Sequence, residues 1–105
     1  MTRDPIDPVI RRRLVVHGRV QGVWFRGSVE RQAHALGVAG WVRNRPDGTV
    51  EAVFEGDAAA VARAAAYCSN GPPRARVARV ESFEEEPEGL VGFEVRYDVQ
   101  DPRAW

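Results

Sequence analysis

The spacing of the apolar residues changes in the first half of the chain, and this change restricts the possible folds more than any other feature. In "RRLVVHG" (12–18), Leu14 and Val16 share one side of an extended chain, and a glycine ends the run. The next apolar residues recur at helical spacing, and a glycine suited to a helix C-cap follows, at Phe25, Val29, Ala33, Leu36 and Gly37. We therefore predict a strand and then a helix.

A strand period returns after this helix. "VAGWVRN" (38–44) is predicted to be a strand, and "RPDG" (45–48) has proline and glycine at the positions that favour a β-turn. Polar and apolar residues then alternate in "TVEAVFEG" (49–56). The alternation predicts an inward set and an outward set, which are Val50, Ala52 and Phe54 against Thr49, Glu51 and Glu55. Residues 38–56 are thus expected to form a hairpin.

The second half of the chain repeats the pattern of helix and strand. "DAAAVARAAAYCS" (57–69) is predicted to be a helix with Asp57 as its N-cap, and "NGPP" ends it. "RVARVESFE" (76–84) and "GFEVRY" (92–97) are predicted to be strands. Val77 and Val80 are out of strand phase, which indicates a β-bulge.

This order of elements predicts an α+β fold of the ferredoxin-like kind, a split β-α-β sandwich. We expect a mainly antiparallel sheet with two helices on one face and the other face open. Residues 11–98 would form the domain, preceded by a flexible N-terminal arm (1–10) and followed by a C-terminal tail (99–105). Many unrelated functions use this fold, so the fold alone does not predict the activity.

Composition excludes several classes of function. The chain has 105 residues and a formal net charge of zero, whereas nucleic-acid-binding domains are usually basic. All 15 basic residues are arginine, which excludes a Schiff-base lysine. A single cysteine excludes an intrachain disulfide, and neither a signal peptide nor a membrane-length apolar run is recognisable. We expect a cytoplasmic protein that does not bind membranes.

The segment "GRVQGVWFRG" (18–27) connects the first predicted strand to the first predicted helix. Its glycines, Gly18 and Gly22, give the backbone freedom to point successive N–H groups at an anion near the helix N-terminus. Arg26 lies in the first helical turn, where its guanidinium group can bind two phosphate oxygens. The same residues also suit an ordinary turn, with Arg19 exposed to solvent.

Asn44 is expected at the same level as this loop. The predicted helix descends about 18 Å from its N-terminus, and the strand that follows climbs back about 20 Å. Asn44 also shares a strand phase with Val38 and Val42, on the face that the helices would cover. Its amide is therefore placed to bind a water or a ligand beside the anion, although an asparagine before "RPDG" also suits a turn.

Two segments of the chain resemble the signature motifs of the acylphosphatases. The first is "VHGRVQGVWFR" (16–26) and the second is "GWVRNRPDGTVEAVFEG" (40–56), and both match the family's pattern without a departure. "CSNGPPRARVARVE" (68–81) and "GFEVRY" also look like the family, so the resemblance covers about residues 12–97.

The resemblance implies an enzyme that hydrolyses an acyl phosphate to a carboxylate and inorganic phosphate, without a metal ion or another cofactor. By position, Arg26 would be the phosphate-binding arginine and Asn44 would orient the attacking water. Backbone N–H groups would surround the phosphoryl oxygens, at Gln21, Gly22, Val23, Trp24, Phe25 and Arg26. We expect a free-standing monomer that acts on a small acyl phosphate, with inorganic phosphate or sulfate as a simpler ligand.

Four other interpretations remain open. "CSNGPPR" fits the C-x5-R spacing of cysteine-dependent phosphatases, but it lacks a preceding strand and a following helix, and two prolines remove N–H donors. The domain could be a non-catalytic module that senses an anion or a nucleotide. It could bind nucleic acid through Trp41 and Tyr97 on the open face, which neutral charge disfavours. It could also serve a larger carbamoyl-transferring protein. His17 is expected on the open face, in a structural role.

Overall fold

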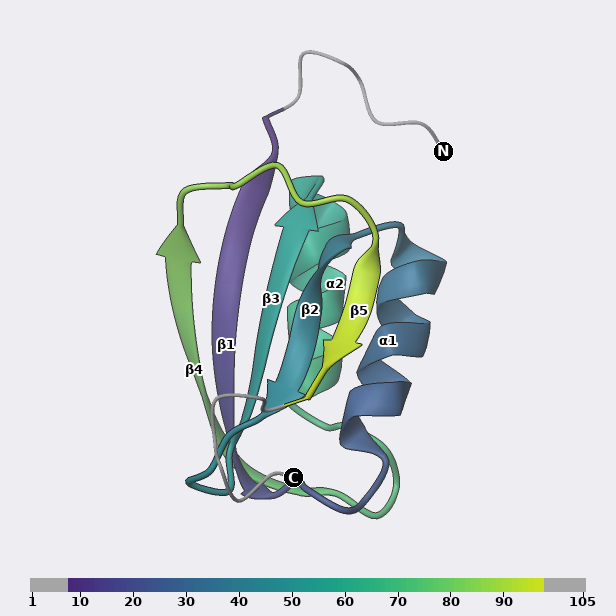
Figure 1. Ribbon diagram of the computed structural model, residues 1–105, viewed down its shortest axis with the longest axis vertical. Helices are drawn as coiled ribbons and strands as arrows, with labels where there is room; N and C mark the ends of the chain where they lie inside the picture. The colour runs from purple at the N-terminus through teal and green to yellow at the C-terminus, as the bar shows by residue number, and fades with distance from the viewer. Residues whose placement is uncertain (1–7, 98–105) are drawn as a thin grey trace.

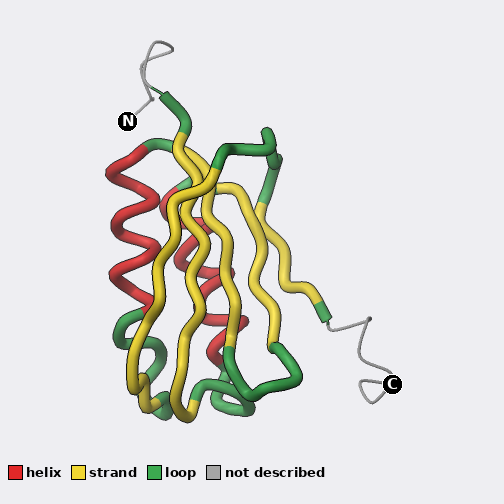
Figure 2. Tube along the Cα trace, turned by 90° about the vertical axis from the view of Figure 1, so that its left-hand side faces the viewer, coloured by secondary structure: helices red, strands yellow, loops and turns green. Residues whose placement is uncertain are grey.

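The chain folds into a five-stranded sheet with two helices packed on one of its faces (Figure 1 and Figure 2). The structure, a computed structural model, describes residues 8–97. Its elements are β1 (Ile10–Arg19), α1 (Phe25–Leu36), β2 (Ala39–Asn44), β3 (Val50–Gly56), α2 (Ala58–Cys68), β4 (Arg76–Glu85) and β5 (Phe93–Arg96). The predicted tail (99–105) and residues 1–7 of the predicted arm lie outside the described part of the chain.

The strands lie in the order β4-β1-β3-β2-β5. Neighbouring strands are antiparallel, except that β2 and β5 run parallel. This arrangement confirms the predicted ferredoxin-like α+β fold. Neither helix in the described part of the chain is long and apolar enough to cross a membrane.

The core lies between the sheet and the helices. The residues predicted to point inward from β3, namely Val50, Ala52 and Phe54, are all fully buried there. Phe54 also stacks on Phe93 of β5, with ring centroids 5.7 Å apart. Each strand therefore contributes one of its two faces to the core, as the period-two pattern requires.

The predicted ends of the helices are confirmed in detail. Helix α1 runs from Phe25 to Leu36, and Gly37 closes it with a left-handed φ of 70°. Helix α2 begins after Asp57, whose carboxylate accepts a hydrogen bond from the Ala60 N–H at 3.4 Å. These caps satisfy backbone groups that a helix end would otherwise leave unpaired.

The predicted bulge is present where β1 pairs with β4. His17 is opposite Arg79, but Gly18 is opposite Val77, so β4 holds one extra residue between them. Gly18 has a φ of 126°, and a Cβ at this position would lie 2.1 Å from the carbonyl oxygen of Arg76. Only glycine allows the two strands to approach this closely.

The outer face of β3 is buried although it lies away from the helices. Glu51 and Glu55 lie on this face as predicted, where they bind arginines, but Glu51 is only 7% exposed and Glu55 only 2% exposed. Thr49, which precedes β3, is buried as well, and its hydroxyl donates to Asp47 in the turn. Arginines on neighbouring strands extend across the sheet and pair with these carboxylates: Arg13 and Arg43 bind Glu51, and Arg11 binds Glu55. Alternation predicts which face a residue occupies, whereas its exposure also depends on the length of the neighbouring side chains.

Glu55 is the most constrained of these carboxylates. It accepts hydrogen bonds from Arg11 at 2.8 Å and from the backbone N–H groups of Glu88, Gly89 and Leu90 at 2.9 to 3.1 Å. Burial by itself would raise the pKa of Glu55, but these hydrogen bonds outweigh it and lower the pKa. Glu55 thereby fastens the connection between β4 and β5 to the centre of the sheet.

Candidate active site

The loop between β1 and α1 has an unusual backbone. Two of its residues have left-handed φ values, Gly22 at 74° and Trp24 at 66°. Glycine adopts this conformation freely, but it is uncommon for a bulky residue and marks local strain. Left-handed residues in a turn direct successive N–H groups into one concavity, which suits an anion. The backbone of this loop therefore contains left-handed residues of the kind that an anion-binding turn uses, as its glycines led us to expect.

The N-terminus of α1 opens onto the same place. Trp24 is the N-cap residue, and among residues 8–97 no side chain accepts a hydrogen bond as a cap there. The first backbone bond of the helix runs from the Ser28 N–H to the Trp24 carbonyl at 3.1 Å. The first turn also holds no acidic residue, so its N–H groups and the positive end of the helix dipole remain available to an anion.

A pocket of about 610 Å³ lies at this helix end. Its lining includes Arg26 from the first turn of α1 and Asn44 from the last position of β2. The predicted return of β2 to the level of the helix N-terminus is thus present. The other lining residues are Val20, Gly22, Trp24, Phe25, Gly27, Glu30, Phe93, Glu94, Val95 and Tyr97.

The six residues predicted for the phosphate loop divide into two groups. Gly22, Trp24, Phe25 and Arg26 line the pocket. The other two are not among the lining residues: Val23 packs against the core, and Gln21 binds the turn between β2 and β3. Their side chains therefore have structural contacts, and only their backbone N–H groups remain candidates for the anion.

Gln21 connects the loop to the strand that carries Asn44. Its side-chain amide donates hydrogen bonds to the carbonyl oxygens of Arg45 at 2.8 Å and Thr49 at 2.9 Å. The turn itself is closed by Asp47, which accepts bonds from the Thr49 backbone N–H at 3.0 Å and its hydroxyl at 2.6 Å. These two bonds to Thr49 hold the pKa of Asp47 below its ordinary value. The motif alone did not predict this side-chain role for Gln21.

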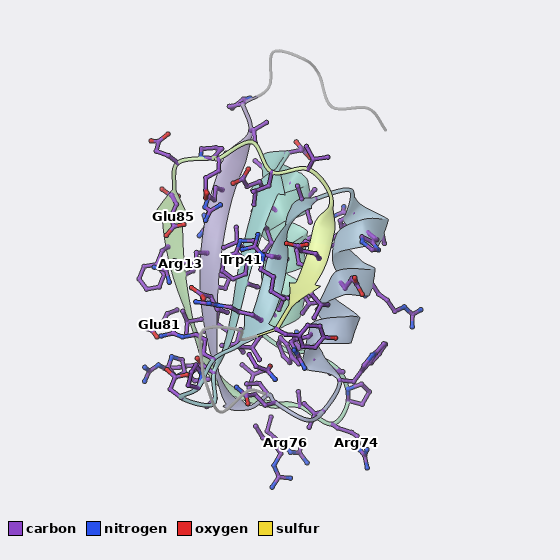
Figure 3. The ribbon with its side chains drawn as sticks, in the orientation of Figure 1. Arg13, Trp41, Arg74, Arg76, Glu81 and Glu85 are labelled. Atoms are coloured by element: carbon purple, nitrogen blue, oxygen red, sulfur yellow. The ribbon has the colours of Figure 1, made fainter. Side chains whose placement is uncertain are left out.

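Tyr97 lies on the side of β5 that faces the pocket. The nucleic-acid interpretation put it on the open face, but it lines the pocket, and its ring centroid lies 5.0 Å from the Arg26 guanidinium carbon. The signal was available, because Phe93 belongs to the core and a period of two puts Val95 and Tyr97 on the same side. Trp41 does occupy the open face, as Figure 3 shows, near the guanidinium groups of Arg43 and Arg96.

Glu30 is a second pocket residue that sequence reasoning missed. It lies one helical turn after Arg26, at the i+4 spacing that brings two side chains to the same face of a helix. That spacing could have revealed it once Arg26 had been placed at the site.

Two other reactive side chains lie away from the pocket. His17 is on the open face, where its Nε2 atom is 2.6 Å from Glu81 and forms no part of the pocket lining. Cys68 ends α2 and is fully buried, and this burial raises the pKa of its thiol to about 12. A cysteine-dependent phosphatase needs a thiolate, so the C-x5-R interpretation is wrong. Arg74, the arginine of that motif, is exposed and points away from the sheet (Figure 3).

Comparisons with known proteins agree with the two signature motifs. The sequence profile of the acylphosphatase family matches residues 12–95. An acylphosphatase of Thermococcus kodakarensis is 59% identical over 86 residues, which cover 82% of this chain and 94% of the relative. An acylphosphatase of Rubrobacter xylanophilus is 60% identical over 88 residues, which cover 82% of this chain and 79% of the relative.

Solved structures point to the same family. The crystal structure of the acylphosphatase from Bacillus subtilis matches with a TM-score of 0.81 at 38% identity, covering 84% of this chain and 99% of that one. The profile match contains the whole of α1, β2 and β3, and therefore both Arg26 and Asn44. The chain belongs to the acylphosphatase family.

Proposed function

We propose that this acylphosphatase acts through Arg26 and Asn44, with the phosphoryl group held by Arg26 and by the backbone N–H groups of residues 21–26. One observation carries the proposal: these two side chains come from different elements and line one pocket at the uncapped N-terminus of α1. The family membership favours hydrolysis of an acyl phosphate over a non-catalytic module that senses an anion or a nucleotide.

The reaction suits these groups. The oxygen of a water molecule attacks phosphorus, the bond between phosphorus and the acyl oxygen breaks, and the electron pair leaves with the carboxylate. A carboxylic acid has a pKa of about 4, so its anion leaves without a proton from the enzyme. Phosphoryl transfer therefore depends on positioning and on stabilisation of charge on the equatorial oxygens.

Arg26 supplies most of this stabilisation in the proposal. Its guanidinium group donates several N–H bonds in a planar fork that matches two phosphate oxygens. The N–H groups of the loop and of the first turn of α1 add further donors, which need no reorganisation during the reaction. Together they supply the charge stabilisation that a metal ion supplies in many other phosphoryl-transfer enzymes, so we expect hydrolysis without a metal ion or cofactor.

Asn44 has a different role in the proposal. Its side-chain amide is uncharged and can donate and accept hydrogen bonds, which suits a group that orients a water molecule. It lines the pocket from the end of β2, whereas Arg26 lines it from α1. In the proposal, Asn44 holds the attacking water, while Arg26 and the loop hold the phosphoryl group.

The decisive experiment measures hydrolysis of acetyl phosphate and benzoyl phosphate by the purified protein, before and after exhaustive treatment with EDTA. We expect release of phosphate well above the uncatalysed rate, and the same rate after chelation. An alkyl phosphate monoester is the matched control substrate, because its alkoxide leaving group needs a general acid. A rate no higher than that in buffer would refute catalysis, and a loss after chelation that added metal restores would refute metal independence.

We also propose that the protein is a cytoplasmic monomer. The lone cysteine is a buried core residue and is not exposed for an interchain disulfide. Light scattering should give the mass of a single chain, 11.7 kDa. A mass of twice this value would refute the monomer.

A further inference from the structure

We propose that Trp24 and Tyr97 form an aromatic subsite that binds the acyl group of the substrate, and that the enzyme therefore prefers flat, apolar and uncharged acyl groups. This inference depends on the proposed function, because it assigns the part of the pocket that the phosphoryl group leaves free. Both side chains line the same pocket as Arg26.

Trp24 is held in place by three features of the structure. Its backbone is left-handed, with a φ of 66°. Its indole packs against Gly27, because a Cβ at that position would lie 2.2 Å from the indole nitrogen. The Arg31 guanidinium carbon lies 5.8 Å from the centroid of the ring. The side chain is nevertheless 57% exposed, so one of its surfaces remains free to contact a ligand.

Tyr97 approaches the pocket from the other side. It follows β5, and its ring lies over the Arg26 guanidinium carbon at 5.0 Å. The residue is 69% exposed. Arg26 thus lies between the two aromatic residues along the surface: Trp24 precedes it in the loop, and Tyr97 covers its guanidinium group. An acyl group bonded to a phosphate on Arg26 would contact these rings.

The size and charge of the pocket narrow the chemical class of the acyl group. A volume of about 610 Å³ exceeds what acetyl phosphate fills and is within the usual range for an organic ligand. One carboxylate, that of Glu30 on α1, belongs to a residue that lines the pocket, and an acyl group with its own negative charge would meet it. Glu94 also lines the pocket, but its carboxylate accepts a hydrogen bond from Arg96 at 2.8 Å on the open face. Aromatic faces favour stacking of flat apolar groups. The subsite therefore suits a benzoyl-like group better than an acetyl or a carboxylated one.

The test compares kcat/KM for benzoyl phosphate and for acetyl phosphate in the wild type and in single variants. Trp24→Ala and Tyr97→Ala should each lower the preference for benzoyl phosphate by about 5- to 10-fold, the range expected for loss of one aromatic contact. Trp24→Phe and Tyr97→Phe keep a ring and should retain most of the preference. The inhibition constant of benzoate should rise in the alanine variants, while that of acetate should not.

Trp41→Ala is the matched control, because it removes the same side chain from the opposite face of the sheet (Figure 3). It should leave the substrate preference unchanged. Inhibition by inorganic phosphate provides a second control: an unchanged constant in Trp24→Ala shows that the loop still holds an anion. If Trp24→Ala weakens phosphate binding, the loop itself has changed, and Trp24→Phe provides the test at this position. Loss of the preference for benzoyl phosphate in Trp24→Phe, which keeps a ring, would refute the subsite.

The two proposals fail in different ways. A wild-type protein that hydrolyses neither substrate refutes the proposed function. A wild-type protein that hydrolyses both, with a preference that neither alanine variant changes, refutes only the aromatic subsite. A wild-type preference for acetyl phosphate over benzoyl phosphate likewise refutes the subsite and leaves the hydrolysis intact.

Discussion

The side-chain amide nitrogen of Gln21 lies 2.8 Å from the carbonyl oxygen of Arg45, the residue that follows Asn44. This hydrogen bond ties the loop before α1 directly to the end of β2. Arg26 and Asn44 belong to the two elements that Gln21 connects, so their relative position depends on this amide. The loop thus contains both the backbone that we propose for binding the anion and a link to the strand that carries Asn44.

Replacing Gln21 with alanine should reduce turnover although Gln21 does not line the pocket. The variant loses two partly buried hydrogen bonds, at about 1 kcal/mol of folding free energy each. A small displacement of Asn44 from Arg26 should lower kcat by roughly 10- to 100-fold. Steady-state kinetics and urea unfolding measure the two effects. Gln32→Ala, on the exposed face of α1, is the control and should change neither.

Arg26→Ala should nearly abolish activity. Loss of one charged donor to the phosphoryl oxygens should raise the barrier by at least ~3 kcal/mol, which is a fall of more than 100-fold in kcat/KM. Inhibition by inorganic phosphate should weaken as well. Arg26→Lys should not restore activity, because an ammonium group cannot bind two oxygens in a planar fork.

The control for Arg26 is Arg19→Ala, which removes an exposed arginine where β1 enters the same loop. It should retain activity within a few-fold of the wild type. Wild-type activity in either Arg26 variant would show that another group binds the phosphate.

Asn44→Ala should separate binding from catalysis. We expect kcat to fall on the order of 100-fold, the size of the effect of one positioned hydrogen-bonding group. The inhibition constant of inorganic phosphate should stay nearly the same, because Asn44 is proposed to hold water and not phosphate. Asn70→Ala, in the exposed loop after α2, is the control. Equal losses in turnover and in phosphate binding would assign Asn44 to the phosphate instead.

The carboxylates of the open face should make the protein sensitive to acid. Arg13 and Arg11 hold the pKa of Glu85 below its ordinary value of 4.5, and the pKa of Glu55 is also lowered. A carboxylate with a lowered pKa in the folded state stabilises the fold above the unfolded pKa and loses this effect as the pH falls. The free energy of unfolding should therefore decrease from about pH 5 downward.

Glu55→Gln should reproduce part of this loss at neutral pH. The variant leaves Arg11 without one of its carboxylates, and Arg11 is itself only 9% exposed. We expect a loss of roughly 3 kcal/mol in unfolding free energy, the lower end for a broken buried pair, because Arg11 keeps Glu85. Glu84→Gln removes an exposed carboxylate from the same sheet and should have little effect. Equal stabilities of the two variants would contradict the role of Glu55.

The sequence was sufficient to predict the order of the elements and most of their ends. The change from strand to helix spacing of the apolar residues predicted α1 from Phe25 to Leu36. Val77 and Val80 do not share a strand face, which predicted the bulge. The ends of the elements and the bulge depend on residues close together in the chain, so local sequence patterns are enough to predict them. The two motifs also placed Arg26 and Asn44 in segments that line one pocket.

The features that sequence reasoning missed depend on contacts between distant segments. Glu55 is buried because Arg11 and the connection after β4 cover it, and no local pattern shows how far those groups extend. The left-handed backbone of Trp24 is likewise set by its surroundings, since local preference would favour glycine there. Tyr97 was assigned to the wrong side of the sheet. It is four residues after Phe93, a core residue, so the two side chains are expected on the same side.

The sheet order also has a consequence for how the molecule is made. Arg11 and Glu85 pair although they are 74 positions apart, and β5 adds to the sheet beside β2, far from it in the chain. Contacts of this kind form slowly, because long stretches of chain must be ordered before they are gained. Val20 and Tyr97 line one pocket, so a ribosome must synthesise the chain as far as Tyr97 before that pocket can form. A nascent chain that ends before β5 would carry both signature motifs and still lack one wall of the site.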